Sequence, residues 1–146
     1  MKSPVTLLLE DHKAIKKLFK EFEKADRRSE RRIATEAIEL IEIHHEIEED
    51  IFYPEIRKAL PDEFIVEEGL EEHHVIRMLM EELKAIETID IHYEAKFKVL
   101  QENTEHHFEE EEEKMFPKAS KLDPELLHAI AEAITIKKEE QLAAQE

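Results

Sequence analysis

Apolar residues recur at spacings of three and four along most of this 146-residue chain, as they do on one face of an α-helix. Leu8, Ile15 and Phe22 belong to the first such stripe. It begins after Ser3-Pro4, an N-cap serine followed by proline at the first helical position. The whole pattern predicts five helices, over residues 4–25, 30–53, 63–87, 91–116 and 124–141. No segment shows the strict alternation that indicates a β-strand.

The breaks between these helices are short. Residues 26–29 are predicted to form a turn, Pro54 either kinks the second helix or starts a short turn, and Pro61-Asp62 marks the next break. Long amphipathic helices with short connections predict an all-α fold. We expect an antiparallel up-down-up-down four-helix bundle over about residues 4–119, within one domain of residues 1–146. The additional C-terminal helix, about residues 124–141, either caps the bundle or pairs with a second copy of the chain as a homodimer.

Composition removes several classes of function. The chain has no cysteine, which excludes disulfides, thiolate zinc sites and cysteine-held iron–sulfur clusters. Its single glycine leaves no material for a glycine-rich phosphate loop. The formal net charge of −17 disfavours nucleic acid and anionic lipid as partners. No apolar run reaches the length of a membrane span and no signal-peptide pattern is seen, so the expected location is cytoplasmic.

Two stretches of the chain are nearly the same. Residues 44–54 and 107–117 each begin with histidine, have a glutamate four positions later, then an aromatic residue, and end with proline ten positions after the histidine. A further histidine precedes each stretch, at His12 and His73. A duplication that preserves imidazoles and carboxylates, rather than only apolar residues, suggests a metal site built from two half-sites.

Helical neighbours indicate which of the nine histidines point inward. His12, His44, His73 and His107 lie on apolar stripes. His45 is predicted to flank the core, while His74 and His106 lie on more polar faces, and His92 and His128 belong to no motif. Glu48 and Glu111 follow His44 and His107 by four residues, so they share the inward faces.

A buried carboxylate without a partner costs several kcal/mol, so Glu48 and Glu111 need either a buried salt bridge or a bound cation. The core stripes have few inward lysine or arginine residues near these levels, which favours the cation. At 1.5 Å per residue, His44 and Glu48 lie roughly 9–15 Å from the end of their helix, and His12 lies roughly 12 Å from the start of the first. Antiparallel packing therefore brings all six side chains to one level of the bundle. Four imidazoles and two carboxylates suit two carboxylate-bridged ions. The mixed donor set fits iron or manganese, with zinc allowed by softness.

The sequence also contains the pattern of a different metal site. Ferritin-like di-iron bundles use Glu-x-x-His pairs, and Glu42-x-x-His45 and Glu71-x-x-His74 match that spacing. Glu42, however, lies on a polar face, and the fourth helix offers no such pair. Tyr53 lies about 140° around an α-helix from Glu48, so it is predicted to be structural.

The segments 9–12, 44–54, 71–75 and 106–117 together resemble the hemerythrin-like, or HHE cation-binding, domain family, over about residues 8–119. The resemblance implies a di-iron centre in which Glu48 and Glu111 bridge the two irons. It implies the iron ligands His12, His44, Glu48, His73, His107 and Glu111. Hemerythrins that carry oxygen typically show five histidines, whereas four are inward here, which argues against reversible O2 carriage. Related members are implicated in O2 or NO binding, iron sensing and iron–sulfur repair.

Three functions follow as hypotheses. The first is a non-haem di-iron protein that binds or senses a small diatomic ligand, O2 or NO, or handles iron. The second is a di-iron enzyme for NO reduction, peroxide decomposition or ferrous oxidation, although the sequence indicates no further acid–base pair and no catalytic residue. The third is a partner-binding helical module with a zinc-filled or vestigial site, for which the extra helix around residues 127–134 is the argument.

Overall fold

The amphipathic segments form helices throughout the part of the chain that the computed structural model describes, residues 1–61 and 64–145. Two five-residue π-helical segments interrupt the α-helices, η1 (Glu48–Phe52) and η2 (Glu111–Met115). The α-helices are α1 (Pro4–Lys24), α2 (Arg27–Ile47), α3 (Tyr53–Ala59), α4 (Ile65–Ala85), α5 (Ile91–Glu110), α6 (Phe116–Ala119) and α7 (Pro124–Gln145).

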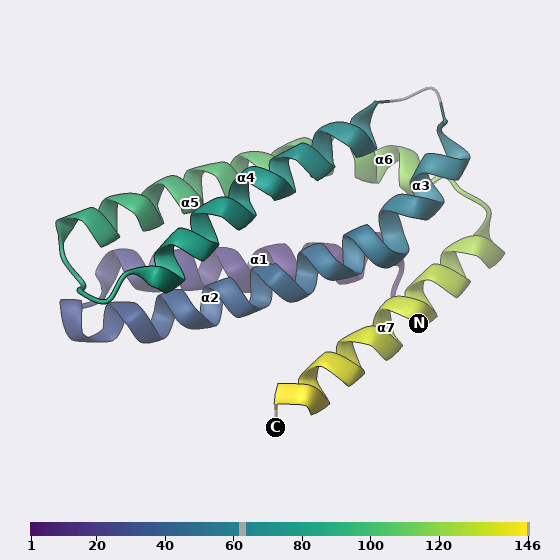
Figure 1. Cartoon of the computed structure of the whole chain (residues 1–146). Coiled ribbons are helices and arrows are strands. Elements are labelled where there is room, and N and C mark those ends of the chain that lie inside the picture. Colours follow the sequence, from purple (N-terminus) through teal and green to yellow (C-terminus); the bar gives the residue numbers. More distant parts are fainter. Residues whose placement is uncertain (62–63, 146) are drawn as a thin grey trace.

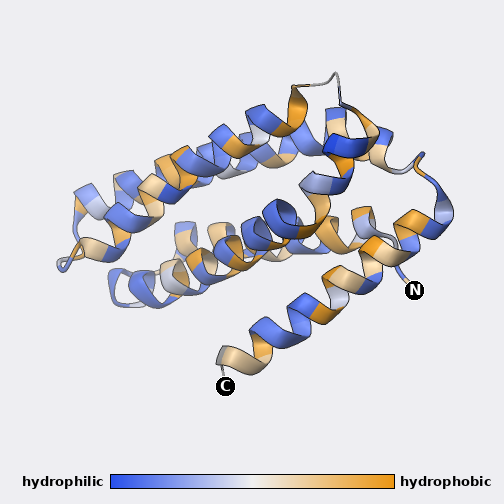
Figure 2. Ribbon diagram, turned by 45° about the vertical axis from the view of Figure 1, so that its right-hand side comes forward, coloured by the Kyte–Doolittle hydropathy of each residue, from blue (hydrophilic) through white to orange (hydrophobic). Residues whose placement is uncertain are grey.

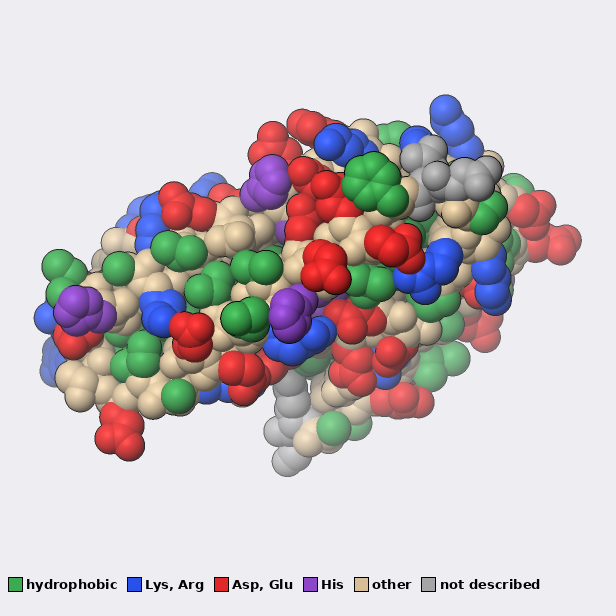
Figure 3. Space-filling model, turned by 45° about the horizontal axis from the view of Figure 1, so that its top comes forward, with side chains coloured by type: hydrophobic (Ala, Val, Ile, Leu, Met, Phe, Trp, Pro, Cys, Tyr) green, Lys and Arg blue, Asp and Glu red, His purple; other side chains and the backbone are tan. Residues whose placement is uncertain are grey.

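The bundle consists of two helical hairpins. The first contains α1 and α2 and the second contains α4 and α5, and in each pair the helices run antiparallel with a short connection (Figure 1). Hydrophobic and hydrophilic residues alternate along every helix, as Figure 2 shows, and the apolar positions form the buried core. The outer face is rich in acidic side chains, with lysine and arginine scattered among them (Figure 3). The predicted all-α bundle is confirmed.

Capping residues explain where the first two helices begin. Ser3 accepts a hydrogen bond from the backbone N–H of Thr6, as its N-cap position predicts. Asp26 accepts one from the backbone N–H of Ser29 in the same way. The second helix therefore begins at Arg27, and the predicted turn over residues 26–29 is wrong because Asp26 is an N-cap.

Proline does not end the second and fourth helices where the sequence suggested. Pro54 and Pro117 each lie in the first turn of a further helix, where a missing N–H leaves no hydrogen bond unmade. These continuations, α3 and α6, carry the chain to residues 59 and 119. The predicted ends at residues 53 and 116 are therefore too early. The predicted start of the third helix at residue 63 lies outside the described residues.

The C-terminal helix α7 packs against the bundle of its own chain, beside α1 and α2 (Figure 1). Ile130 and Ile134 are buried and join the core cluster that contains Leu8 and Ile47. The helix thus contacts the bundle of its own chain, and pairing with a second copy stays a prediction. None of the described helices has an apolar stretch long enough to cross a membrane.

Candidate metal centre

Six inward side chains meet at the end of the bundle where α2 and α5 pass into their π-helical segments. One atom from each of four residues lies within 4.8 Å of the others in two overlapping groups. The first group contains His12 and His44, the second contains His73 and His107, and both contain Glu48 and Glu111. The structure thus brings together all six residues that the sequence singled out, as two half-sites that share two carboxylates.

The donor atoms are deeply buried, and some have no other partner. All six side chains are at most 3% exposed. His44 Nε2 and Glu48 Oε2 have no hydrogen-bond partner among the described residues, although they face each other at 3.4 Å. Buried polar atoms are normally satisfied. Imidazole nitrogens and carboxylate oxygens that cluster in one buried space are a donor set that fits divalent transition metals.

Each of the four inward histidines is held by a carboxylate on the side away from the centre. The Nδ1–oxygen distances are 2.8 Å for His12–Glu112, 2.8 Å for His44–Asp11, 2.8 Å for His73–Glu49 and 2.6 Å for His107–Glu72. In a neutral imidazole, a carboxylate acceptor at Nδ1 fixes the ring proton on that nitrogen. The lone pair of Nε2 is then available to bind a metal. The same arrangement therefore orients all four rings.

These four acidic residues were missed by the sequence analysis, yet they obey the repeat. Asp11 and Glu72 each precede the first histidine of a repeat, and each supports the second histidine of the same repeat. Glu49 and Glu112 each follow the shared glutamate, and each supports a histidine of the other repeat. The sequence signal that identifies these supporting residues is an acidic residue next to the same histidine, or next to the same glutamate, in both copies of the repeat.

Tyr53 is part of the centre, and its prediction as a structural residue is wrong. Its hydroxyl donates to Glu111 Oε2 at 2.6 Å and lies 3.3 Å from Nε2 of both His73 and His107. The 140° separation from Glu48 assumed an α-helix. In the π-helical segment the N–H of Tyr53 bonds the carbonyl of Glu48, five residues back, so five residues complete about one turn. The two side chains therefore share a face.

The single glycine of the chain makes room for this phenol. A Cβ at Gly69 would lie 2.9 Å from the Tyr53 hydroxyl and 3.2 Å from Cζ of the same ring. Glycine inside a helix costs about 0.5–1 kcal/mol relative to alanine. Gly69 lies well within α4, so its place there is explained by the close approach of Tyr53.

His45 is also buried, which corrects its prediction as a flanking residue. It is 3% exposed and stacks on the ring of His73, with centroids 3.6 Å apart and an 8° angle between planes. Neither ring nitrogen has a hydrogen-bond partner among the described residues. One of its nitrogens lies within 4.8 Å of donor atoms of His73 and His107. The polar residues that neighbour His45 on its own helix do not indicate this contact with His73 of α4.

Charges inside the centre set the protonation of its groups. Burial lowers the pKa of His44, but the charges of Glu48 and Asp11 outweigh burial and raise it to about 10. His107 follows the same balance, with Glu111 and Glu48 holding its pKa well above the usual range. Burial and the charges of the neighbouring imidazoles keep the pKa of His45 well below it. Burial raises the pKa of Tyr53, and Glu111 and Glu48 raise it further.

The described residues do not form the ferritin-like metal site. Glu71 and His74 are exposed on α4. Glu42 is partly exposed and pairs with Lys84. In the described part of the chain, neither Glu-x-x-His pair forms a metal-ligating group of its own.

Comparisons with known proteins agree with the geometry. The family model described as the hemerythrin HHE cation binding domain matches residues 3–119. A crystal structure of a hemerythrin HHE cation binding domain-containing protein from Mycobacterium kansasii superposes with a TM-score of 0.85, at 22% sequence identity. The alignment covers 99% of this chain and 90% of that one, and supports the fold. No curated protein matched. Since the family model spans most of the chain, including all six clustered residues, this protein belongs to the hemerythrin HHE cation-binding domain family.

Proposed function

We propose that this protein binds two iron ions in the bundle and uses them to bind or sense a small diatomic ligand, O2 or NO. The observation that carries the proposal is the set of four histidines, each held at Nδ1 by its own carboxylate and each turned toward a shared pair of glutamates. Packing alone requires no such arrangement. Metal-binding histidines, in contrast, are commonly supported in this way.

The ligand count favours ions with open positions. In each half-site, two imidazoles and two carboxylates offer four protein atoms. Two ions at this site would be bridged by Glu48 and Glu111, which belong to both groups. Iron or manganese commonly takes more donors than four, so positions remain for a small ligand. Iron would supply redox-active, Lewis-acidic centres at those positions. Manganese and zinc match the same donors and are alternatives for the experiment to separate.

Metal content and a matched set of alanine variants test the proposal. Protein reconstituted anaerobically with ferrous iron should bind two ions per chain. His44→Ala should lose the ion of its own half-site, and Glu111→Ala, which removes a donor from both half-sites, should lose most of this content. His74→Ala and His92→Ala serve as controls, because both residues are exposed and neither belongs to a cluster of metal-ligating side chains among the residues that the structure describes. Equal losses in both sets, or a wild-type protein without metal, would overturn the assignment.

A change in the visible spectrum tests the ligand. Adding O2 or NO to the anaerobic ferrous protein should give new charge-transfer absorption in proportion to the iron bound. The exposed-histidine controls should give the same change as the wild type. A fully loaded protein with an unaltered spectrum would leave metal binding standing and would remove the diatomic ligand.

An enzymatic role is the second candidate, because the centre contains a protic group that the sequence did not indicate. The Tyr53 hydroxyl lies 2.6 Å from Glu111 and beside the His73 and His107 nitrogens, in a buried site. A phenol so placed can donate a hydrogen bond or a proton to a molecule held in that half-site. This supports turnover of peroxide or NO, or ferrous oxidation, as the second candidate. Multiple turnovers of H2O2 or NO per centre would establish it, and a single stoichiometric reaction would exclude it.

A further inference from the structure

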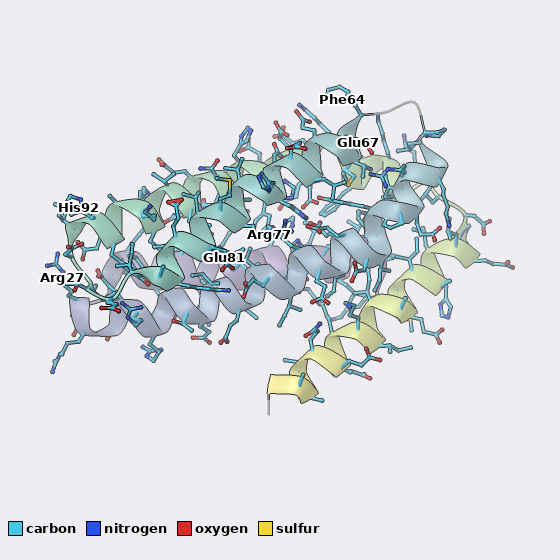
Figure 4. The ribbon with its side chains drawn as sticks, viewed as in Figure 1. Arg27, Phe64, Glu67, Arg77, Glu81 and His92 are labelled. Atoms are coloured by element: carbon cyan, nitrogen blue, oxygen red, sulfur yellow. The ribbon has the colours of Figure 1, made fainter. Side chains whose placement is uncertain are left out.

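A surface hollow lies between α2 and α4, on one side of the metal centre. Its volume is about 240 Å³. Its lining is mostly acidic, from Glu42, Glu46, Glu49, Asp50 and Glu81, together with Arg77, Met80 and His45. Arg77 and Glu81 lie on the side of α4 that faces α2 (Figure 4). We call this feature the acidic hollow.

His45 and Met80 are the buried residues that line the acidic hollow, and His45 is the one with unsatisfied polar atoms. Its ring is 97% covered, yet both nitrogens lack a hydrogen-bond partner within the described chain. The four inward histidines differ from it, since each has a carboxylate at Nδ1. A buried imidazole that makes no hydrogen bond is costly, and a metal ion that visits the hollow would relieve that cost.

Two carboxylates of the acidic hollow, those of Glu46 and Asp50, are paired with a lysine of α7. Lys137 pairs with Glu46 and Asp50 at 3.1 and 3.4 Å, and Glu46 and Asp50 are about half exposed. Exposed ion pairs of this kind are weak, typically about 0–1 kcal/mol. A divalent cation can therefore displace the lysine without a large energetic penalty. Acidic clefts of this type concentrate cations and raise their rate of association.

The distance from the acidic hollow to the metal centre is short. A nitrogen of His45 lies within 4.8 Å of donor nitrogens on both His73 and His107. Glu49 lines the hollow and also holds Nδ1 of His73, at 2.8 Å. A cation bound by His45 thus lies next to the half-site that would receive it.

We propose that the acidic hollow is the loading port of the metal centre, and that His45 is a transfer ligand which takes a divalent cation there and passes it to His73 and His107. This rests on the proposed function, since it presumes that the six-residue centre binds metal. His45 binds the cation in transit and is not a ligand of the filled centre.

The repeat provides a matched control for each part of the port. Position 45 corresponds to Phe108, which stacks on His12 as His45 stacks on His73, with centroids 3.7 Å apart. His45→Phe thus installs a ring that the other half already accommodates. Glu46 and Asp50 correspond to Glu109 and Glu113, which are exposed.

Stopped-flow absorbance with Co²⁺ as the probe measures loading of the metal-free protein. His45→Phe should slow the visible change, because it removes the transfer ligand, and should leave the final content at two ions per chain. The double variant Glu46→Gln/Asp50→Asn should slow loading, whereas Glu109→Gln/Glu113→Gln, with the same loss of charge, should not. Circular dichroism confirms that each variant is folded.

Three results would overturn the port. Loading of His45→Phe at the wild-type rate would remove the transfer role. A final content of one ion per chain would show that His45 is a permanent ligand instead. Equal slowing by both charge variants would show that only the overall charge matters. A wild-type protein that takes up no Co²⁺ would instead overturn the proposed function itself.

Discussion

The two halves of the metal centre have nearly the same ligand geometry. The rings of His12 and His44 have centroids 4.9 Å apart at an interplanar angle of 70°, and those of His73 and His107 are 4.7 Å apart at 72°. Every one of these rings is supported by a carboxylate in the same manner. The duplication therefore keeps the residues that we propose as metal ligands, and we expect any difference in reactivity to come from the neighbours of these residues.

Those neighbours differ at two corresponding positions. Phe116 lies 5.6 Å from the ring of His12, and Tyr53 lies 5.3 Å from the ring of His73. In the same way, Phe108 packs on the first half and His45 on the second. We call the His12/His44 side the phenylalanine half and the His73/His107 side the polar half. The phenylalanine half is shielded by rings that cannot donate a proton, so we expect the small ligand to react at the polar half.

The largest effect should come from removing a ligand in one half only. His107→Ala should weaken metal binding in the polar half by more than about 100-fold, beyond the 10–100-fold typical of a lost supporting residue, and should abolish the reaction with NO. His44→Ala should cause a similar loss in the phenylalanine half and leave NO binding at the remaining iron. Metal titration followed by NO spectroscopy compares the two. Equal loss of NO binding would mean that the halves act only together.

Tyr53→Phe should have the next largest effect, because it makes the polar half resemble the other half. The variant removes a hydroxyl that donates to Glu111 and leaves all six clustered donors in place. We expect two ions per chain and a rate of reaction with H2O2 about 100-fold lower, the smaller end of what general acid catalysis contributes. Phe116→Tyr is the converse variant, which adds a hydroxyl to the phenylalanine half, and it should not lower that rate. Rates measured by stopped flow that are equal in Tyr53→Phe and wild type would remove the distinction between the halves.

The pH dependence should be shared by both halves, since each contains one histidine with a raised pKa. His44 has a pKa of about 10 against an ordinary value near 6.5, so it is protonated at neutral pH before metal binds. His107 is raised in the same direction. Metal must displace both protons, so affinity should rise with pH and binding should release protons. Calorimetry in two buffers of different ionisation enthalpy measures the release. Binding without proton release would contradict neutral ligand histidines.

The metal-free protein should show the opposite trend in stability. A pKa raised from about 6.5 to about 10 gives stabilisation that is complete below pH 6.5 and is lost as pH rises through 10. Asp11 has a lowered pKa, despite burial, because of His44 and Lys138, so its contribution is present above its ordinary pKa and lost in acid. Urea unfolding of the metal-free chain at pH 6, 8 and 10 should therefore give falling free energies. A constant value would show that these pairs do not form.

The sequence was sufficient to place the six clustered residues because they follow helical periodicity. His44 and Glu48 are four residues apart, and their whole helix keeps a regular α-helical face as far as residue 47. The ends of α2 and α5 could not be predicted in this way, because a π-helical turn has no clear signal in one sequence. Tyr53 was misplaced for that reason, since one extra residue per turn rotates everything that follows it.

His45 was misplaced for a different reason. Its burial comes from a ring on another helix, His73, and not from the residues that flank it in the sequence. The supporting acids were overlooked because single acidic residues are common in a chain with a charge of −17. A position-by-position comparison of the two copies of the repeat would have revealed the supporting acids, because each has an acidic counterpart in the other copy. The fold was therefore accessible from local pattern, while the contacts between helices required the structure.

The smallest effect concerns the space that the polar half gives to its phenol. Gly69 in α4 corresponds to Leu8 in α1, and Leu8 packs in the same core cluster as Phe116, the counterpart of Tyr53. Leu8 therefore fits in α1 because its neighbouring ring, that of Phe116, has no hydroxyl. Gly69→Ala should stabilise the helix by about 0.5–1 kcal/mol, yet it must push the hydroxyl away from a Cβ that would otherwise lie 2.9 Å from it.

We therefore expect stability and reactivity to move in opposite directions in Gly69→Ala. The thermal midpoint should rise or stay constant, metal content should stay at two ions, and the reaction with H2O2 should slow by a few-fold, about 1 kcal/mol in barrier. In the Tyr53→Phe background the same substitution should cause no further slowing, because the hydroxyl that it displaces is gone. A double-mutant cycle measures this coupling. Additive effects would mean that Gly69 serves the packing of α4 and does not position Tyr53. The π-helical turn alone would then explain why the Tyr53 hydroxyl lies in the polar half.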